Sequence, residues 1–186
     1  MRIISGIFKG KKISLPKDNF TRPLRDLVKE SIFNLIEHSN KFRCTITNSS
    51  VLDIFSGTGS FGIECISRDA KNVIFVENYK EAIFVLKKNI STLKPKKNYK
   101  IIEKNCFDIF NTNKEFTDKF DIIFLDPPYK EKKINIIIEY IKDNGILNQD
   151  GIMIIHRHKK DNTAITKKLK ILEERVYGIS KIYIGN

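Results

Sequence analysis

The chain has 186 residues, of which 30% are charged and 41% hydrophobic, and its formal net charge is +12. This length predicts one domain, residues 1–186, that can bury a sizeable core. No apolar stretch approaches the ~20 residues that span a bilayer, and the N-terminus lacks the apolar region of a signal peptide. We therefore expect a cytoplasmic protein, and the positive charge favours a polyanionic partner bound in a salt-dependent way.

Cysteines and histidines are few and irregularly spaced. Cys44, Cys65 and Cys106 fit neither a disulfide framework nor a CxxC metal pair, so we expect free thiols. The histidines, which include His156 and His158, form no HExxH or three-ligand pattern. No metal site is predicted.

The N-terminal region, residues 1–40, predicts an arm followed by a helix. Residues 1–20 are typical of a short β-hairpin or arm with turns at Gly6 and Gly10. A helix over 23–38 begins at Pro23, whose fixed φ suits the first helical position. Basic side chains gather here, and we interpret them as an RNA-facing patch: Lys9, Lys11, Lys12, Arg22 and Arg25, with Lys17. The plainer alternative is a solvated surface in a lysine-rich chain.

Residues 50–186 predict a catalytic core in which strands and helices alternate. Strands near 51, 73, 99, 121 and 151 alternate with helical segments after 60, 80, 105 and 134. Residues 170–176 and 179–184 form a closing hairpin around Tyr177-Gly178. The expected fold is α/β, a doubly wound, mostly parallel, Rossmann-like sheet of seven strands.

A glycine-rich turn follows the first of these strands. Residues 51–62 combine a strand, a turn and a helix start, and they satisfy the GxGxxG spacing of dinucleotide sites. Asp53, just before the glycines, would repel a pyrophosphate. S-adenosylmethionine (SAM) carries a sulfonium and an ammonium but no phosphate, so an acid there favours SAM. Gly57 and Gly59 allow positive φ and close approach to a ligand. A tight turn without a ligand is the alternative.

The next two strands also end in polar residues. Glu77 lies about twenty residues beyond the first glycine, where an acid commonly binds ribose hydroxyls. Asn105, Cys106 and Phe107 follow the third strand, where an adenine ring needs a polar contact and an apolar wall. Because parallel strands end at one edge, we expect a single crevice to hold the polar residues Asp53, Glu77, Asn105 and Asp126.

The most informative motif is the apolar strand 121–125 followed by Asp126-Pro127-Pro128-Tyr129. The prolines hold Asp126 and Pro127 in extended geometry, so their oxygens point outward. Such acceptors on an exocyclic amine, adenine N6 or guanine N2, draw its delocalised electrons back to nitrogen, while Tyr129 stacks on the base. The motif predicts methylation of an exocyclic amine. A Pro-Pro turn at a strand end is the plainer reading.

Along its whole length the chain resembles the RsmD family, bacterial methyltransferases that modify guanine 966 of 16S ribosomal RNA at N2. The resemblance is carried by Met1-Arg2-Ile3-Ile4-Ser5-Gly6, Thr21-Arg22-Pro23, Lys29-Glu30-Ser31-Ile32-Phe33-Asn34, the loop 53–62, Phe75-Val76-Glu77 and Asp126-Pro127-Pro128-Tyr129. It implies a class I SAM-dependent methyltransferase acting on 16S rRNA, free or in a small-subunit assembly intermediate. No membrane and no obligate protein partner are expected.

The resemblance also implies roles for individual residues. Asp126, Pro127, Pro128 and Tyr129 would bind and activate the guanine for a direct in-line transfer, with Arg22 and the helix after it at the entrance. SAM would be surrounded by Asp53, Phe55, Ser56, Gly57, Gly59, Glu77, Asn78, Asn105 and Cys106. Two positions depart from the family pattern: Asn105 stands where an acid is frequent, and His156 where the fifth strand often ends in Glu.

Three alternatives remain open at the level of sequence. A DNA adenine-N6 methyltransferase would use the same two motifs, but it usually carries a target-recognition segment that so short a chain lacks. A nicotinamide-dependent oxidoreductase fits GxGxxG but leaves Asp53 and Asp126 unexplained. An RNA-binding protein without catalysis would bind RNA and transfer no methyl group.

Overall fold

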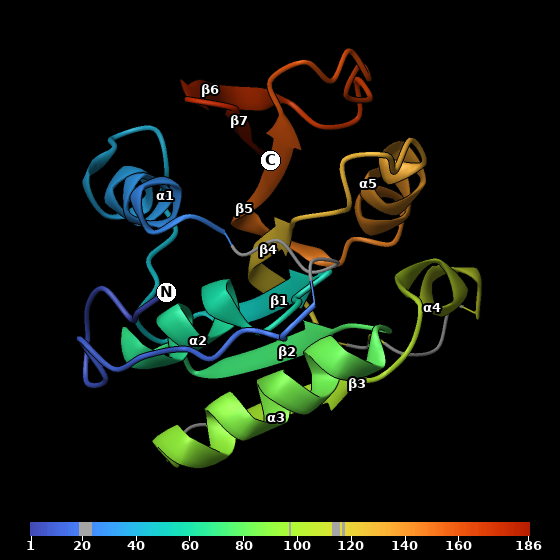
Figure 1. Ribbon diagram of the computed structural model, residues 1–186. Coiled ribbons are helices and arrows are strands. Elements are labelled where there is room, and N and C mark those ends of the chain that lie inside the picture. The colour runs from blue at the N-terminus through green and yellow to red at the C-terminus, as the bar shows by residue number, and fades with distance from the viewer. Residues whose placement is uncertain (19–23, 97, 113–115, 117) are drawn as a thin grey trace.

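A seven-stranded sheet forms the centre of the computed structural model, which describes residues 1–18, 24–96, 98–112, 116 and 118–186 (Figure 1). The strands are β1 (Ser50–Ile54), β2 (Asn72–Val76), β3 (Asn98–Ile102), β4 (Phe120–Leu125), β5 (Leu147–His158), β6 (Ile171–Tyr177) and β7 (Ser180–Gly185). The helices are α1 (Asp26–His38), α2 (Ser60–Ser67), α3 (Lys80–Leu93), α4 (Cys106–Thr112) and α5 (Ile134–Asp143). None of the described helices is long and apolar enough to cross a membrane.

The order of strands is β3-β2-β1-β4-β5-β7-β6. The first five are parallel, and the last two form an antiparallel hairpin whose second strand, β7, pairs with β5. The predicted doubly wound, mostly parallel sheet is confirmed, including the closing hairpin. At the N-terminus the expected hairpin is reduced to one bridge between Arg2 and Lys12. Helix α1 begins at Asp26, and Pro23 lies outside the described residues.

Helices cover both faces of the sheet (Figure 1). Apolar residues of α1, α2 and α3 pack with one set of strand side chains, among them Val51, Ile122 and Ile154. Helices α4 and α5 pack with the alternating set, among them Leu52 and Ile123. Because both faces are covered, strand β4 carries a continuous apolar run, Ile122 to Leu125, rather than an alternation of polar and apolar residues.

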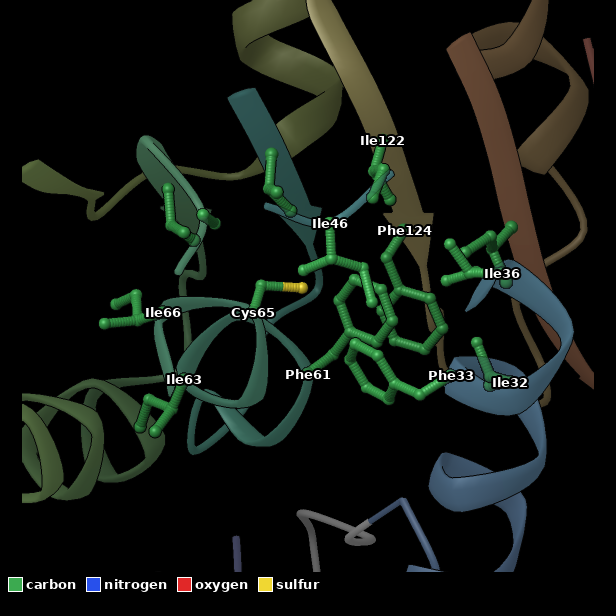
Figure 2. Close-up of a cluster of buried hydrophobic side chains, with 14 of the residues drawn as sticks. Ile32, Phe33, Ile36, Ile46, Phe61, Ile63, Cys65, Ile66, Ile122 and Phe124 are labelled. Atoms are coloured by element: carbon green, nitrogen blue, oxygen red, sulfur yellow. The ribbon is translucent and has the colours of Figure 1, made fainter. Parts of the chain in front are cut away.

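Three aromatic rings join α1, α2 and β4 inside the first of these clusters (Figure 2). The ring of Phe61 stacks on Phe124 with centroids 4.1 Å apart, and it stacks on Phe33 at 5.0 Å. Aromatic pairs contribute roughly 0.5–1.5 kcal/mol beyond their buried area. The stack fixes the start of α2, and therefore the glycine turn before it, against the strand that leads to Asp126.

The N-terminal arm is anchored by the buried carboxylate of Glu64 in α2. Its oxygens accept hydrogen bonds from the backbone N–H groups of Ile4 (2.8 Å) and Ser5 (2.9 Å) and from Nε of Arg68 (3.0 Å). Nζ of Lys29 in α1 lies 3.5 Å away, and both side chains are 0% exposed. Burial lowers the pKa of Lys29, and the charge of Glu64 opposes that shift. One acid therefore joins the arm, α1 and α2.

We expect Glu64→Gln to destabilise the fold, because it removes the nearer of the two acids beside buried Lys29 among the described residues, leaving only Asp26 at 4.0 Å, and removes an acceptor from the arm. Breaking one side of a buried pair costs about 3–5 kcal/mol. Urea unfolding followed by circular dichroism measures this loss. The control is Glu37→Gln, since Glu37 pairs with Arg68 at a partly exposed position, where a surface ion pair contributes about 0–1 kcal/mol. Equal stability of both variants would show that Glu64 does not anchor the arm.

Candidate active site at the carboxyl edge of the sheet

The turn between β1 and α2 has the backbone geometry that its glycines predict. Gly57 and Gly59 have φ of 55° and 82°, and Phe55 also has a positive φ, 61°. A Cβ at Gly59 would collide with the side chain of Leu86. The N–H of Ser56 donates to Val76 O at 3.1 Å, so the turn is also tied to the end of β2. These constraints bring backbone close to the edge where the parallel strands end.

Asp53 lies beneath this turn and is 1% exposed. Its Oδ2 accepts a hydrogen bond from the N–H of Gly62 at 2.9 Å, whereas Oδ1 is buried with no partner among the described residues. Burial raises the pKa of Asp53; the Gly62 hydrogen bond opposes this shift, and the charges of Asp126 and Glu77 add to it. An orphaned acceptor of this kind is costly unless a donor or a cation meets it.

Glu77 follows β2 directly and faces the same turn. Its Oε2 accepts from the N–H of Gly57 at 2.8 Å, and its Oε1 accepts from the N–H groups of Asn78 and Tyr79 at 2.9 Å. The second pair of bonds fixes the carboxylate within its own turn. Glu77 and the glycine turn are therefore neighbours, as the spacing predicts.

The third strand supplies the segment 105–107. Asn105 Oδ1 accepts from the N–H of Phe107 at 3.0 Å and so caps the start of α4, while Cys106 is buried. Burial raises the pKa of the Cys106 thiol to about 12, which keeps it a thiol at neutral pH. The ring of Phe107 lies edge-on to Phe55, with centroids 6.2 Å apart. An aromatic wall and a capping asparagine stand beside the turn.

The acid-proline motif leaves β4 at the same edge. The N–H of Asp126 donates to Ile54 O at 3.3 Å, so Asp126 lies beside the last residue of β1. Its Oδ1 lies 2.7 Å from Nδ1 of His156 in β5. Pro127 is buried and Pro128 exposed. The ring of Tyr129 is half-buried, and the imidazoles of His156 and His158 meet it edge-on, with centroids 6.2 Å and 5.0 Å from its own.

Lys9, one of the predicted basic residues, does not lie at this edge. Ile7 and Phe8 hydrogen bond to Ser67 at the far end of α2, which places the neighbouring Lys9 beside the opposite edge of the sheet. The remaining described residues of the set, Lys11, Lys12, Lys17 and Arg25, are exposed along the arm and before α1, and Arg22 lies outside the described residues. Their contact with RNA stays a prediction.

Sequence reasoning missed two contacts that shape the site. Asn89, buried in α3, donates to Thr58 O in the glycine turn at 3.1 Å and exchanges hydrogen bonds with the backbone of Ser14 in the arm. Its only sequence signal is a polar residue on an otherwise apolar helix face. The contact of His156 with Asp126 joins two strands and has no local signal at all.

This strand order, with covering helices on both faces, defines a class I methyltransferase fold. It is shared by a solved structure from Escherichia coli described as a candidate methyltransferase, which has a TM-score of 0.81, 25% identity, and coverage of 100% of this chain and 96% of that one. The chain belongs to the family described as Conserved hypothetical protein 95, the RsmD family, whose profile matches residues 1–186.

Two relatives of known name cover nearly the whole chain. Ribosomal RNA small subunit methyltransferase D of Haemophilus influenzae is 32% identical over 181 residues, 96% of this chain and 90% of its own length. A Bacillus subtilis protein described as a candidate rRNA methyltransferase is 32% identical over 185 residues, 99% of this chain and 97% of its own length. The similarity therefore includes the arm as well as the sheet.

The raised pKa of Asp53 predicts a pH-dependent difference between wild type and Asp53→Asn. A carboxyl whose pKa is raised by folding adds stability below its unfolded-state pKa and loses that contribution as pH rises through its folded-state pKa. Asparagine does not titrate. The Tm of Asp53→Asn relative to wild type should therefore increase as the pH rises above about 4, the ordinary pKa of an aspartate, measured by calorimetry without ligand. A difference independent of pH would contradict the burial of an ionisable Asp53.

Proposed function

We propose that this protein transfers a methyl group from SAM to the exocyclic N2 of a guanine in 16S ribosomal RNA. One observation carries the proposal: Asp53 and Asp126 lie side by side at one sheet edge. Strands β1 and β4 pair with Ile54 opposite Leu125, and the two carboxylates are close enough for the charge of Asp126 to raise the pKa of Asp53. A donor in the glycine turn and an acceptor base at the motif would then meet in one cleft.

The residues around the glycine turn fit SAM. The unpartnered Oδ1 of Asp53 suits the ammonium of its methionine moiety, because a cation there relieves a buried, orphaned acceptor. Glu77 would bind the ribose hydroxyls, and Phe55 and Asn105 would adjoin the adenine. The other expected contacts are Ser56, Gly57, Gly59, Asn78 and Cys106. When bound, SAM would supply an electrophilic methyl group on a sulfonium.

The motif residues fit the nucleophile. Asp126 and the carbonyl of Pro127 would accept hydrogen bonds from the target amine and return electron density to its nitrogen, while Tyr129 stacks on the ring and Pro128 shapes the turn. Holding both reactants in line replaces a bimolecular encounter, which contributes roughly 7–11 kcal/mol. The guanine has to leave its stack to enter the cleft, and unpaired RNA bases do this readily.

An RNA substrate is supported by the names of the full-length relatives and by the net charge of +12. We propose Lys9, Lys11, Lys12, Arg22 and Arg25 as the residues that bind RNA. Because Lys9 lies beside the opposite sheet edge, it would bind RNA phosphates away from the reacting base. A long footprint of this kind suits folded ribosomal RNA, free or within a small-subunit particle.

The decisive experiment follows labelled methyl from SAM into 16S rRNA, or into small subunits that lack the modification, with nucleoside analysis of the product. N2-methylguanine is expected. N6-methyladenine in DNA would instead establish the alternative, a DNA adenine methyltransferase. Calorimetric titration with SAM and with a nicotinamide dinucleotide separates a methyltransferase from an oxidoreductase, and RNA binding without any transfer would leave only a binding protein.

Asp126→Ala should lower methyl transfer by roughly 10²–10³-fold or more, because it removes a preorganised acceptor from the amine. Binding of RNA, measured by filter retention, should persist, since the basic arm is untouched. Asp150→Ala is the matched control: Asp150 is an exposed acid that pairs with Arg43 at 3.8 Å. Unchanged transfer by Asp126→Ala would remove Asp126 from this role.

A further inference from the structure

The side chain of His156 is built into the wall of the site. It lies in β5 and is 5% exposed, and its Nδ1 lies 2.7 Å from Oδ1 of Asp126. Its second ring nitrogen, Nε2, is buried and has no hydrogen-bond partner among the described residues. Burying a polar ring with one nitrogen unpaired costs free energy, and the single contact with Asp126 offsets only part of that cost.

The contact indicates which atom carries the hydrogen of this bond. A carboxylate can only accept, so the hydrogen of this bond belongs to Nδ1 of His156. A neutral imidazole then carries a lone pair on Nε2. A hydrogen there would be a buried donor with nothing to accept it, which costs about 1–3 kcal/mol. The geometry therefore favours the Nδ1–H tautomer of His156, whose ring occupies one oxygen of Asp126.

We propose that His156 is a positioning residue for methyl transfer: it occupies Oδ1 of Asp126 and fixes the carboxylate plane, so that Oδ2 is the oxygen of Asp126 that accepts from the target amine. The inference rests on the proposed function, whose acceptor is Asp126. A freely rotating carboxylate would offer the amine several orientations. A fixed one presents a single lone-pair direction, which is the preorganisation that an electrostatic catalyst needs.

Strand register holds His156 in place for this role. Leu125 pairs with Ile155, so Asp126, the first residue after β4, lies beside His156, which is still paired with Ile182 of β7. The neighbouring Arg157 holds the segment after the motif. It is 2% exposed, its Nη2 donates to Glu131 O at 2.7 Å, and its Nε pairs with Asp161. The consecutive residues His156 and Arg157 of β5 thus hold the motif at Asp126 and at Glu131, two residues after Tyr129.

Two substitutions separate positioning from packing. His156→Phe keeps a ring of similar size but removes the donor, and we expect kcat to fall about 100-fold, as for a reacting group displaced by about 1 Å. His156→Asn loses the ring but places an amide N–H where Nδ1 lies, and it should recover kcat to within about 10-fold of wild type. Dissociation constants for SAM and RNA should change little in both variants. His38→Phe, at an exposed end of α1, is the control.

The outcomes divide clearly. A wild-type kcat in His156→Phe, or a loss that His156→Asn shares in full, would overturn the proposal, because ring packing would then be the only role. A loss expressed in SAM or RNA affinity with kcat unchanged would overturn it as well. Recovery by asparagine with both affinities intact supports it.

A second measurement does not depend on activity. Nitrogen-15 NMR of the imidazoles in the whole protein should show His156 as the Nδ1–H tautomer, and Asp126→Ala should shift it toward Nε2–H while His38 stays unchanged. An Nε2–H tautomer in wild type would overturn the pair even if methyl transfer is observed. Conversely, an Nδ1–H tautomer in a protein that transfers no methyl would leave the pair intact and remove the proposed function.

Discussion

The register of β4 between β1 and β5 is the constraint on which the site depends. Ile54, Leu125 and Ile155 lie opposite one another across the three strands. A slip of one residue would turn every side chain of a strand to the other face of the sheet. Both faces are buried by different helices, so the packing of each strand opposes such a slip. Asp126 and His156, the residues that follow Leu125 and Ile155, are placed side by side by the same packing that stabilises the core.

Two buried acids in this chain illustrate the difference between a structural and a functional carboxylate. Glu64 accepts from the arm backbone and from Arg68 and lies beside Lys29, so its burial is compensated within the fold. Asp53 is as deeply buried, yet one of its oxygens has no partner among the described residues. A fold selected for stability alone would fill that position with an apolar residue or supply a donor. Leaving it open costs stability and is characteristic of ligand sites.

Local sequence patterns predicted most of the architecture, for identifiable reasons. Apolar runs bounded by glycine, proline and acids mark strands whose ends carry the motifs, and the turn at Gly59 needs a backbone that only glycine adopts without strain. The neighbourhood of Asp53 and Asp126 followed from the rule that parallel strands end at one edge. Each of these motifs is contained within about a dozen consecutive residues, and the general rule for parallel sheets brings the separate motifs together.

The remaining features depend on contacts between residues that are distant in the chain, and local sequence patterns do not predict such contacts. The arm folds back on α2 because Gly6 packs against the Ser67 backbone and Glu64 binds the arm, separations of about sixty residues. For that reason Lys9, near the start of the arm, lies away from the cleft. The contact of His156 with Asp126 spans thirty residues in the same way.

The side chain of Asn89 connects the arm to the glycine turn by hydrogen bonds. Its side chain hydrogen bonds to Thr58 in the turn and, on its other side, to both backbone groups of Ser14. Further along the arm, Asp18 accepts from the hydroxyl of Tyr79, two residues after Glu77. The arm therefore runs from its anchor at Glu64 to the residues that adjoin the glycine turn. The exposed lysines near the start of the arm are therefore joined to the glycine turn by a continuous series of hydrogen-bonded contacts.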